Sequence, residues 1–250
     1  MRLVRFLYLG QVYYGCLESN EIVFLKGDVS TGFSRTGKKV TEDDVKLLCP
    51  AVPSKAICIG LNYMDHIIES HEKTPTEPVV FMKPSTAVIG PLDKIIYPSL
   101  SKRVDYEGEL AIVIGKRASH VTEEDAADYI LGYTCANDVT ARDLQLPGGQ
   151  WTIAKGFDTF LPMGPCINTD IDPNNLAICT VLNGKTVQSS NTSCLLFKPN
   201  YIVSFISSIM TLAPGDVILT GTTLGIGPMQ TGDTVCVEIE GIGRLVNSVE

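Results

Sequence analysis

The chain has 250 residues, of which 44% are hydrophobic and 19% are charged, and its formal net charge is -8. A chain of this length can bury about three quarters of its extended surface, so it needs no disulfide or structural metal to fold. Phosphate binding depends on clustered Lys and Arg, which this acidic chain lacks. The composition therefore argues against nucleic acid as a partner.

The cysteines and the apolar runs indicate the compartment. The eight cysteines stand singly, without a CxxC pair, at positions 16, 49, 58, 135, 166, 179, 194 and 236. This spacing predicts reduced, buried thiols rather than a disulfide framework or a zinc site. No apolar run approaches the roughly 20 residues that span a bilayer, and the first residues offer no signal cleavage site. We therefore predict a cytoplasmic protein without a membrane partner.

The chain divides into a small N-terminal β module, residues 1–50, and a larger domain, residues 51–250. The module is predicted to hold strands at 2–9 and 21–25, joined through a polar connection over 26–39. The second region opens with an apolar strand at 56–59. A helical pattern follows over 62–71, and Asn62 is a suitable N-cap for that helix.

Two glutamates precede a buried strand in the centre of the chain. Glu109 leads into the apolar run 110–114, and Glu107 lies two residues before it. Side chains two apart on a strand share one face, with Cα atoms about 6.5 to 7 Å apart. No Lys or Arg lies between them in the sequence, and like charges held together need a counter-charge. A divalent cation is therefore the leading candidate.

A third carboxylate follows at the end of a second strand. Residues 122–129, with acids in the first turn, predict a helix, and the run 130–136 predicts a strand that ends at Asn137 and Asp138. An oxygen-only ligand set favours Mg²⁺ or Mn²⁺, with Ca²⁺ as a further candidate. Three carboxylates leave about half of an octahedral shell open, which is typical of a catalytic site.

The C-terminal part consists of strands and turns around one helix. An Asn183-Gly184 turn predicts a hairpin over 181–187, and residues 201–210 predict a helix. Turns at 214–216 and 231–233 each lead into a further strand.

Three further polar residues have two interpretations each. His66 and Glu69 are three apart on the predicted helix, and they form either a surface pair or a dyad in which Glu69 orients His66 as a base. Lys155 is either an exposed lysine or a donor to an oxyanion beside the metal. Spacing alone leaves both questions open.

Six motifs in order give the chain a specific resemblance. They are Gly60-x-Asn62-Tyr63-x-x-His66-x-x-Glu69, Phe81-x-Lys83-Pro84, Asp105-Tyr106-Glu107-Gly108-Glu109, Asn137-Asp138-Val139-Thr140-Ala141-Arg142-Asp143, Lys155-Gly156-Phe157-Asp158-Thr159 and Thr220-Gly221-Thr222. Over residues 57–247 the sequence resembles the fumarylacetoacetate hydrolase family. Its nearest subgroup comprises the small 2-hydroxyhepta-2,4-diene-1,7-dioate isomerases and the acylpyruvate hydrolases.

The resemblance implies a mixed α/β, predominantly β fold, a β-sandwich roll with the small N-terminal β module, and a homodimer. It implies that the segment around His66 and Glu69 is a lid and that this pair activates water in hydrolytic members. The resemblance also assigns the remaining residues of the site. Glu107, Glu109 and Asp138 would hold the metal, and Lys155, Arg142, Gln145 and Thr222 match positions at or near the substrate.

The function implied is that of a Mg²⁺- or Mn²⁺-dependent enzyme acting on small 2-oxo or 2-hydroxy-dienoic acids. The reaction would be C–C hydrolysis of the acylpyruvate or fumarylpyruvate type, or isomerisation of 2-hydroxyhepta-2,4-diene-1,7-dioate. Oxaloacetate decarboxylation or tautomerisation is the alternative, and a non-catalytic metal-binding module is a third. Leu146, Pro147 and Ile153 replace residues that are often basic in the family, which disfavours a substrate with a distant second carboxylate.

Overall fold

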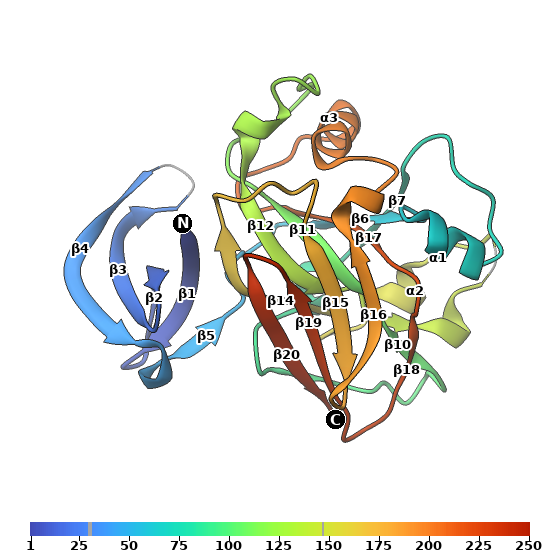
Figure 1. Cartoon of the computed structure of the whole chain (residues 1–250), viewed down its shortest axis with the longest axis horizontal. Coiled ribbons are helices and arrows are strands. Elements are labelled where there is room, and N and C mark those ends of the chain that lie inside the picture. The colour runs from blue at the N-terminus through green and yellow to red at the C-terminus, as the bar shows by residue number, and fades with distance from the viewer. Residues whose placement is uncertain (30–31, 147) are drawn as a thin grey trace.

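The computed structural model describes residues 1–29, 32–146 and 148–250. Within these residues the chain forms many short strands and few helices (Figure 1). The strands are β1 Arg2–Tyr8, β2 Gln11–Glu18, β3 Glu21–Asp28, β4 Gly32–Thr41, β5 Lys46–Leu48, β6 Ala56–Gly60, β7 Val79–Lys83, β8 Val88–Ile89, β9 Lys94–Ile95, β10 Val104–Tyr106, β11 Gly108–Ile114, β12 Ile130–Asn137, β13 Thr140–Ala141, β14 Leu161–Asn168, β15 Ala177–Leu182, β16 Lys185–Asn191, β17 Val217–Thr222, β18 Gly227–Met229, β19 Thr234–Ile239 and β20 Gly243–Val249. The predominantly β fold predicted from the sequence is confirmed.

The helices are short, and α3 is the longest of those described. The α-helices are α1 Met64–Glu69, α2 Thr152–Lys155 and α3 Pro199–Ile209. Single 3₁₀ turns occur at η1 Glu42–Asp44, η2 Ser85–Ala87, η3 Ala126–Tyr129, η4 Arg142–Leu144 and η5 Thr192–Cys194. No helix in the part of the chain that the structure describes has the length and apolar character to cross a membrane.

One large sheet organises the molecule. Its strand order is β4-β3-β2-β1-β14-β12-β11-β17-β6-β7, with β5 and β8 paired at its side. A five-stranded sheet, β16-β15-β19-β20-β9, packs against it, and β10 joins β13 and β18 in a small third sheet. In Figure 1 the N-terminal strands curve at one side of the molecule and α1 lies at the opposite side.

The central strand β11 is buried on both of its faces. Leu110 and Ile112 belong to the core shared with α3 and the five-stranded sheet, whereas Ala111 and Val113 face a second core on the other side. A strand covered on both faces reads as a continuous apolar run, because neither face meets water. This double burial places the residue just before the run, Glu109, in the interior.

The N-terminal strands differ from the prediction. We predicted a polar connection over 26–39, but β3 extends to Asp28 and β4 begins at Gly32, while residues 30 and 31 lie outside the described part. The sequence also gave no sign of β2. A polar edge strand is a common defence against edge-to-edge pairing, so the polar character of 32–41 reflects its place at the sheet edge.

Two helix predictions were wrong in detail. Residues 122–125 form a turn closed by Thr122 and Asp125 (Oγ1 to Oδ2, 2.8 Å), and the helical part is only the 3₁₀ turn η3. The helix fails to extend because strand β12 begins at Ile130. Asn62 is also not an N-cap: Tyr63 occupies that position. The buried amide of Asn62 instead donates to the carbonyls of Phe197 and Thr220, at 3.0 and 2.7 Å.

The other predicted elements are confirmed. The hairpin turns on Asn183 and Gly184, both with positive φ, as a two-residue β-turn of this type requires. The predicted helix over 201–210 is α3, with Pro199 at its start. All eight cysteines are free, as predicted. The prediction that they are buried is confirmed for six but wrong for Cys179, which is half-buried, and for Cys194, which is exposed.

Candidate metal centre and active site

The two glutamates lie where two sheets meet. Strand β10 ends at Tyr106 and β11 begins at Gly108, so Glu107 occupies the break between them and Glu109 lies inside β11. The prediction that both are on one strand is therefore wrong for Glu107. Gly108 makes the break tight, because a Cβ there would lie 2.2 Å from Thr180 Oγ1. Only glycine allows the five-stranded sheet to approach this closely.

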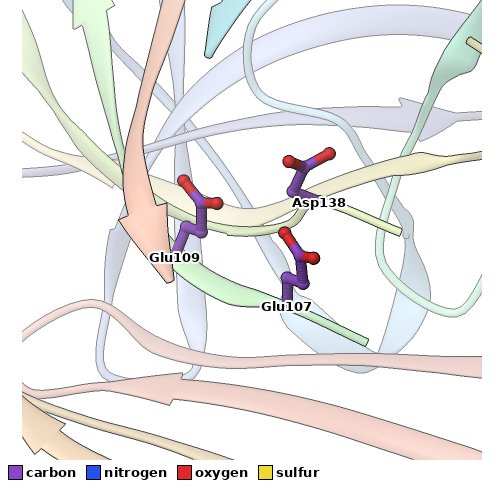
Figure 2. A group of neighbouring side chains, drawn as sticks. All are labelled: Glu107, Glu109 and Asp138. Atoms are coloured by element: carbon purple, nitrogen blue, oxygen red, sulfur yellow. The ribbon is translucent and has the colours of Figure 1, made fainter. Parts of the chain in front are cut away.

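Asp138 meets the glutamates from the neighbouring strand. It follows the end of β12, and its backbone N–H donates to the Glu107 carbonyl at 2.8 Å. One carboxylate oxygen from each of Glu107, Glu109 and Asp138 lies within 4.8 Å of the other two, and all three residues are buried. Figure 2 shows the three side chains turned into the same space. We call this set the acidic triad.

Cations that are distant in the sequence surround the acidic triad. Lys155 Nζ, at the end of α2, donates to Glu107 Oε2 at 2.8 Å and to Asp138 Oδ2 at 2.6 Å. Arg142 pairs with Glu107, and Lys83 Nζ donates to Asp138 Oδ1 at 2.5 Å. No Lys or Arg lies between the glutamates in the sequence, but the fold supplies three cations from distant segments.

Glu109 differs from its two neighbours in its partners. Its Oε2 accepts from the Gly221 backbone N–H at 2.6 Å, and among the described residues it has no Lys or Arg within ion-pair distance. Burial, together with the charges of Asp138 and Glu107, raises the pKa of Glu109 well above its usual range. Burial also opposes ionisation of Glu107, but Lys155 and Arg142 outweigh it and hold the pKa of that carboxyl far below normal. The site therefore lacks positive charge at Glu109.

The acidic triad fits a hard divalent cation. Oxygens bound to one such ion lie at most about 4 to 5 Å apart, given metal–oxygen distances of 2.0 to 2.6 Å, and the triad spans 4.8 Å. Each carboxylate oxygen has about two lone-pair sites, so the oxygens that accept from lysine keep capacity for a metal. The donor set contains no sulfur or imidazole, which favours Mg²⁺, Mn²⁺ or Ca²⁺ over zinc or copper.

His66 and Glu69 form the predicted pair on α1. His66 Nδ1 lies 3.0 Å from Glu69 Oε2, and the imidazole is buried. Glu69 is itself fixed by the Gly225 backbone N–H, 3.1 Å from its Oε1. When Nδ1 carries the proton donated to Glu69, Nε2 is left with its lone pair, as a general base requires. The surface-pair interpretation of His66 is excluded by its burial.

One cavity of about 280 Å³ collects these groups. Eight of the nine predicted site residues line it, and Glu69 stands behind His66. Its remaining wall is largely apolar and includes Phe81, Leu146 and Trp151; Pro147 lies outside the described residues. Within the cavity Arg142 also donates to Gln145 Oε1 at 2.5 Å. The structure brings the predicted residues together, while their roles remain predictions.

Sequence reasoning assigned no role to three residues that build the site. Lys83 belongs to the motif Phe81-x-Lys83-Pro84, and its side chain is buried against Asp138. Asp105 orients Arg142, whose Nε donates to Asp105 Oδ2 at 2.9 Å. Gln188 reaches the site from β16 in the other sheet. Lys83 and Asp105 belong to motifs of the family, which could have identified them. Gln188 belongs to none of the six motifs, and its partners Thr222 and Gly108 are 34 and 80 residues away in the sequence.

The fold and the site together define a class: a β-rich protein whose buried carboxylate cluster fits a divalent metal. Residues 55–250 match the fumarylacetoacetate (FAA) hydrolase C-terminal family, and residues 1–50 match the Rv2993c-like N-terminal family. The chain belongs to the fumarylacetoacetate hydrolase family, as its motifs predicted.

Named relatives indicate the range of reactions in this family. The chain is 43% identical to the mitochondrial oxaloacetate tautomerase of Rattus norvegicus, over 84% of this chain and 71% of that protein. It is 43% identical to the solved 2-hydroxyhepta-2,4-diene-1,7-dioate isomerase of Mycobacterium marinum, with a TM-score of 0.93 and 100% and 98% coverage. The maleylpyruvate hydrolase of Sphingobium sp. SYK-6, solved with manganese(II) and pyruvate, is 29% identical, with a TM-score of 0.83 and 100% and 98% coverage.

Proposed function

We propose that the protein is a divalent-metal-dependent enzyme that moves a proton on small 2-oxo acids, interconverting their keto and enol forms. The observation that carries the proposal is the presence of the acidic triad and the His66–Glu69 pair on one cavity. The names of the rat tautomerase and the mycobacterial isomerase support a proton shift as the reaction class. A proton shift needs a base, a means of stabilising the enolate and room for a small acid, and this cavity offers all three.

The acidic triad would hold the metal, with Mg²⁺ or Mn²⁺ as its candidates. When bound, such an ion supplies a Lewis acid that polarises the 2-oxo group and stabilises the charge of the enolate. The protein residues around it have their own tasks. Lys155 holds Glu107 and Asp138 in place through its ammonium group. Arg142 and Gln145, which line the same wall, would bind and orient the substrate carboxylate.

The proton transfer would fall to His66. In the keto-to-enol direction, Nε2 takes the C3 proton of the substrate, and the electron pair of the broken C–H bond becomes the C2=C3 double bond. The electron pair of the C=O π bond moves to the 2-oxygen, which takes up a proton from water. The hydroxide left behind takes the proton from His66 Nε2, so atoms and charge balance and the base is restored. Glu69 accepts from Nδ1 and keeps the lone pair on Nε2. Buried general bases of this kind contribute about 10²- to 10⁴-fold in rate.

Hydrolysis of a C–C bond is the second candidate. The cavity of about 280 Å³ leaves space for a water molecule, whose share of liquid volume is about 30 Å³, beside a small acid. His66 would then activate that water instead of taking a substrate proton. The name of the hydrolase solved with manganese and pyruvate supports this outcome.

Exchange of the C3 protons of 2-oxo acids in D₂O tests the proposal, because keto–enol interconversion requires it. We expect NMR to show enzyme-dependent deuterium uptake into oxaloacetate or acetylpyruvate in a Mg²⁺ buffer, above the uncatalysed rate. His66→Asn should reduce it at least 100-fold. His120→Asn, at an exposed histidine with positive φ that asparagine tolerates, is the matched control and should leave it unchanged. Cleavage or CO₂ release without exchange would contradict the proton-shift assignment.

Two further predictions accompany this proposal. The homodimer and the cytoplasmic location implied at the outset stay predictions. Light scattering on the purified chain tests the first, since a dimer would have twice the 27.1 kDa mass of one chain.

A further inference from the structure

Ser70 adds a hydroxyl to the His66–Glu69 pair on α1. Glu69 and Ser70 follow His66 by three and four residues, and both spacings bring side chains together on one helical face. The Ser70 backbone N–H donates to the His66 carbonyl at 2.9 Å, so the serine lies one turn after the histidine. Ser70 Oγ lies 3.5 Å from His66 Nε2, and Glu69 Oε2 lies 3.0 Å from Nδ1. The imidazole therefore lies between a carboxylate and a hydroxyl.

The end of α1 places Ser70 at the boundary between the interior and water. The helix ends at Glu69, and His71 has a positive φ, as the residue that follows a left-handed helix cap does. Ser70 is half-buried, whereas His66 is only 7% exposed. Both residues line the cavity. The Ser70 hydroxyl thus connects a buried nitrogen to a position that water reaches.

The proposed reaction leaves a proton on this buried nitrogen. His66 Nε2 takes the C3 proton of the substrate, and it must lose that proton before it can act again. Among the described residues, Ser70 has the one side chain in hydrogen-bonding contact with Nε2. A hydroxyl suits the transfer of a proton because it has a proton to donate and lone pairs that accept.

We propose that Ser70 relays the proton from His66 Nε2 to the hydroxide that forms when the 2-oxygen is protonated. The Nε2–H bond breaks as Ser70 Oγ gains that proton. The Oγ–H bond of the serine breaks as its own proton passes to the hydroxide, which becomes water. The serine gains one proton and loses one, so its hydroxyl is unchanged and the neutral imidazole is restored. This inference deepens the proposed function and rests on it.

The length of the contact fits a residue that acts after the substrate has reacted. A distance of 3.5 Å is at the long end for a hydrogen bond, so the hydroxyl does not hold the Nε2 lone pair against the substrate. Catalytic hydrogen bonds are often this long in the absence of a ligand and shorten in the complex. Protonation turns Nε2 into a donor, which attracts the serine oxygen.

Ser70→Ala tests the relay through its response to an added base. NMR follows exchange of the C3 protons of oxaloacetate in D₂O with Mg²⁺, at low and high imidazole concentration, with the uncatalysed rate subtracted at each. At low imidazole the variant should exchange about 100-fold more slowly than the wild type, the lower end of what a positioned proton-transfer group contributes. Imidazole should restore most of this loss, because a small base can reach the half-buried position that the hydroxyl leaves. The wild-type rate should not respond.

Two further variants serve as controls. Ser70→Thr keeps the hydroxyl and should exchange like the wild type at low imidazole. Ser208→Ala, at an exposed serine in the last turn of α3, is the matched control and should leave the exchange unchanged. An unchanged rate in Ser70→Ala would overturn the relay. A slow rate that imidazole does not raise would also overturn it, because a structural defect in α1 does not respond to a base.

The results separate this inference from the proposed function. Exchange in the wild type, combined with an unchanged rate in Ser70→Ala, would remove the relay and keep the proton-shift reaction. Absence of enzyme-dependent exchange in the wild type would remove both.

Discussion

Charged pairs in the N-terminal strands and in the candidate site use the same residue types in opposite surroundings. In the Arg35–Glu18 pair on the N-terminal strands the side chains are 52% and 43% exposed. In the Lys155–Glu107 pair they are 3% and 6% exposed. Exposed pairs contribute little to stability because water competes for both charges. Buried pairs are expensive to assemble and expensive to break. The same contact therefore contributes to stability only where water is excluded.

Within the site, Glu109 extends this contrast. It is a buried carboxylate that has neighbours of like charge and no cation within ion-pair distance among the described residues. Such an arrangement opposes folding in the metal-free protein. The unfavourable burial of Glu109 needs a compensating interaction, and we propose that metal binding provides it.

Glu109→Gln should have the largest effect. We expect loss of Mg²⁺ binding by calorimetry and a loss of turnover of about 10³-fold, since a Lewis acid supplies several kcal/mol. The same change should raise the Tm of the metal-free protein, because it removes a buried carboxyl whose ionisation is opposed by burial and by the charges of Asp138 and Glu107. The matched control is Glu21→Gln, which removes an exposed carboxylate from the Lys39 pair and should leave binding and turnover unchanged. A variant that still binds Mg²⁺ like the wild type would break the contrast.

Asp216→Ala should reduce the free energy of unfolding by about 3 to 5 kcal/mol, as expected when one partner of a buried ion pair is removed. Asp216 is buried and pairs with Lys55, and it also accepts from the side chain of Ser54 at 2.6 Å. Burial opposes its ionisation, but these hydrogen bonds outweigh burial and lower the pKa of Asp216.

The sign of the pH dependence follows from that lowered pKa. The stabilisation by Asp216 is fully present above the unfolded-state pKa of about 4 and is lost as the pH falls through the folded-state value. Urea unfolding should therefore show a large difference between wild type and Asp216→Ala at pH 7 and a smaller one below about pH 4. A difference independent of pH would show that the ion pair is not its source.

Gly108→Ala should cost about 1 to 3 kcal/mol, as overpacking of a core does. The new Cβ would lie 2.2 Å from Thr180 Oγ1, so the five-stranded sheet has to move away from the site. Gly37→Ala is the control in the N-terminal strands, where a Cβ meets nothing within 4 Å. Differential scanning calorimetry should show a lower Tm for Gly108→Ala and an unchanged Tm for Gly37→Ala. Equal Tm values would show that the approach at Gly108 is not tight.

Glu18→Gln should have the smallest effect. The pair with Arg35 is exposed, so its loss should change the free energy of unfolding by about 1 kcal/mol or less. Even this difference should shrink in 0.5 M NaCl, where the Debye length falls to a few ångströms. Urea unfolding at low and high salt measures both effects. A loss comparable to that of Asp216→Ala would mean that exposure does not separate weak ion pairs from strong ones.

The sequence predicted those parts of the fold and site that depend on local pattern. The apolar run after Glu109, the Asn183-Gly184 hairpin and helix α3 follow from periodicity and turn chemistry, and the ordered motifs identified the family. Strand β4 was missed because an edge strand is polar for reasons of sheet protection. The predicted helix after Thr122 was wrong because a following strand stopped it after one turn.

The site charges could not be predicted in the same way. No Lys or Arg lies between the glutamates in the sequence, yet Lys83, Arg142 and Lys155 reach the acidic triad from separate segments. Such pairing depends on sheet topology, which brings β7, η4 and α2 together around β11. Gln188 was missed for the same reason. Among the three carboxylates, Glu109 is the one without a Lys or Arg within ion-pair distance among the described residues. It is therefore the strongest structural argument for a metal.

The metal dependence of C3 exchange shows whether the acidic triad holds a metal that the reaction needs. The wild-type protein, freed of metal with EDTA and dialysed, is titrated with Mg²⁺ while NMR follows deuterium uptake into a 2-oxo acid in D₂O. We predict no enzyme-dependent exchange without metal, full recovery that saturates with Mg²⁺ or Mn²⁺, and a flat response in Glu109→Gln. Undiminished exchange in the metal-free protein, or a normal Mg²⁺ response in Glu109→Gln, would contradict the account.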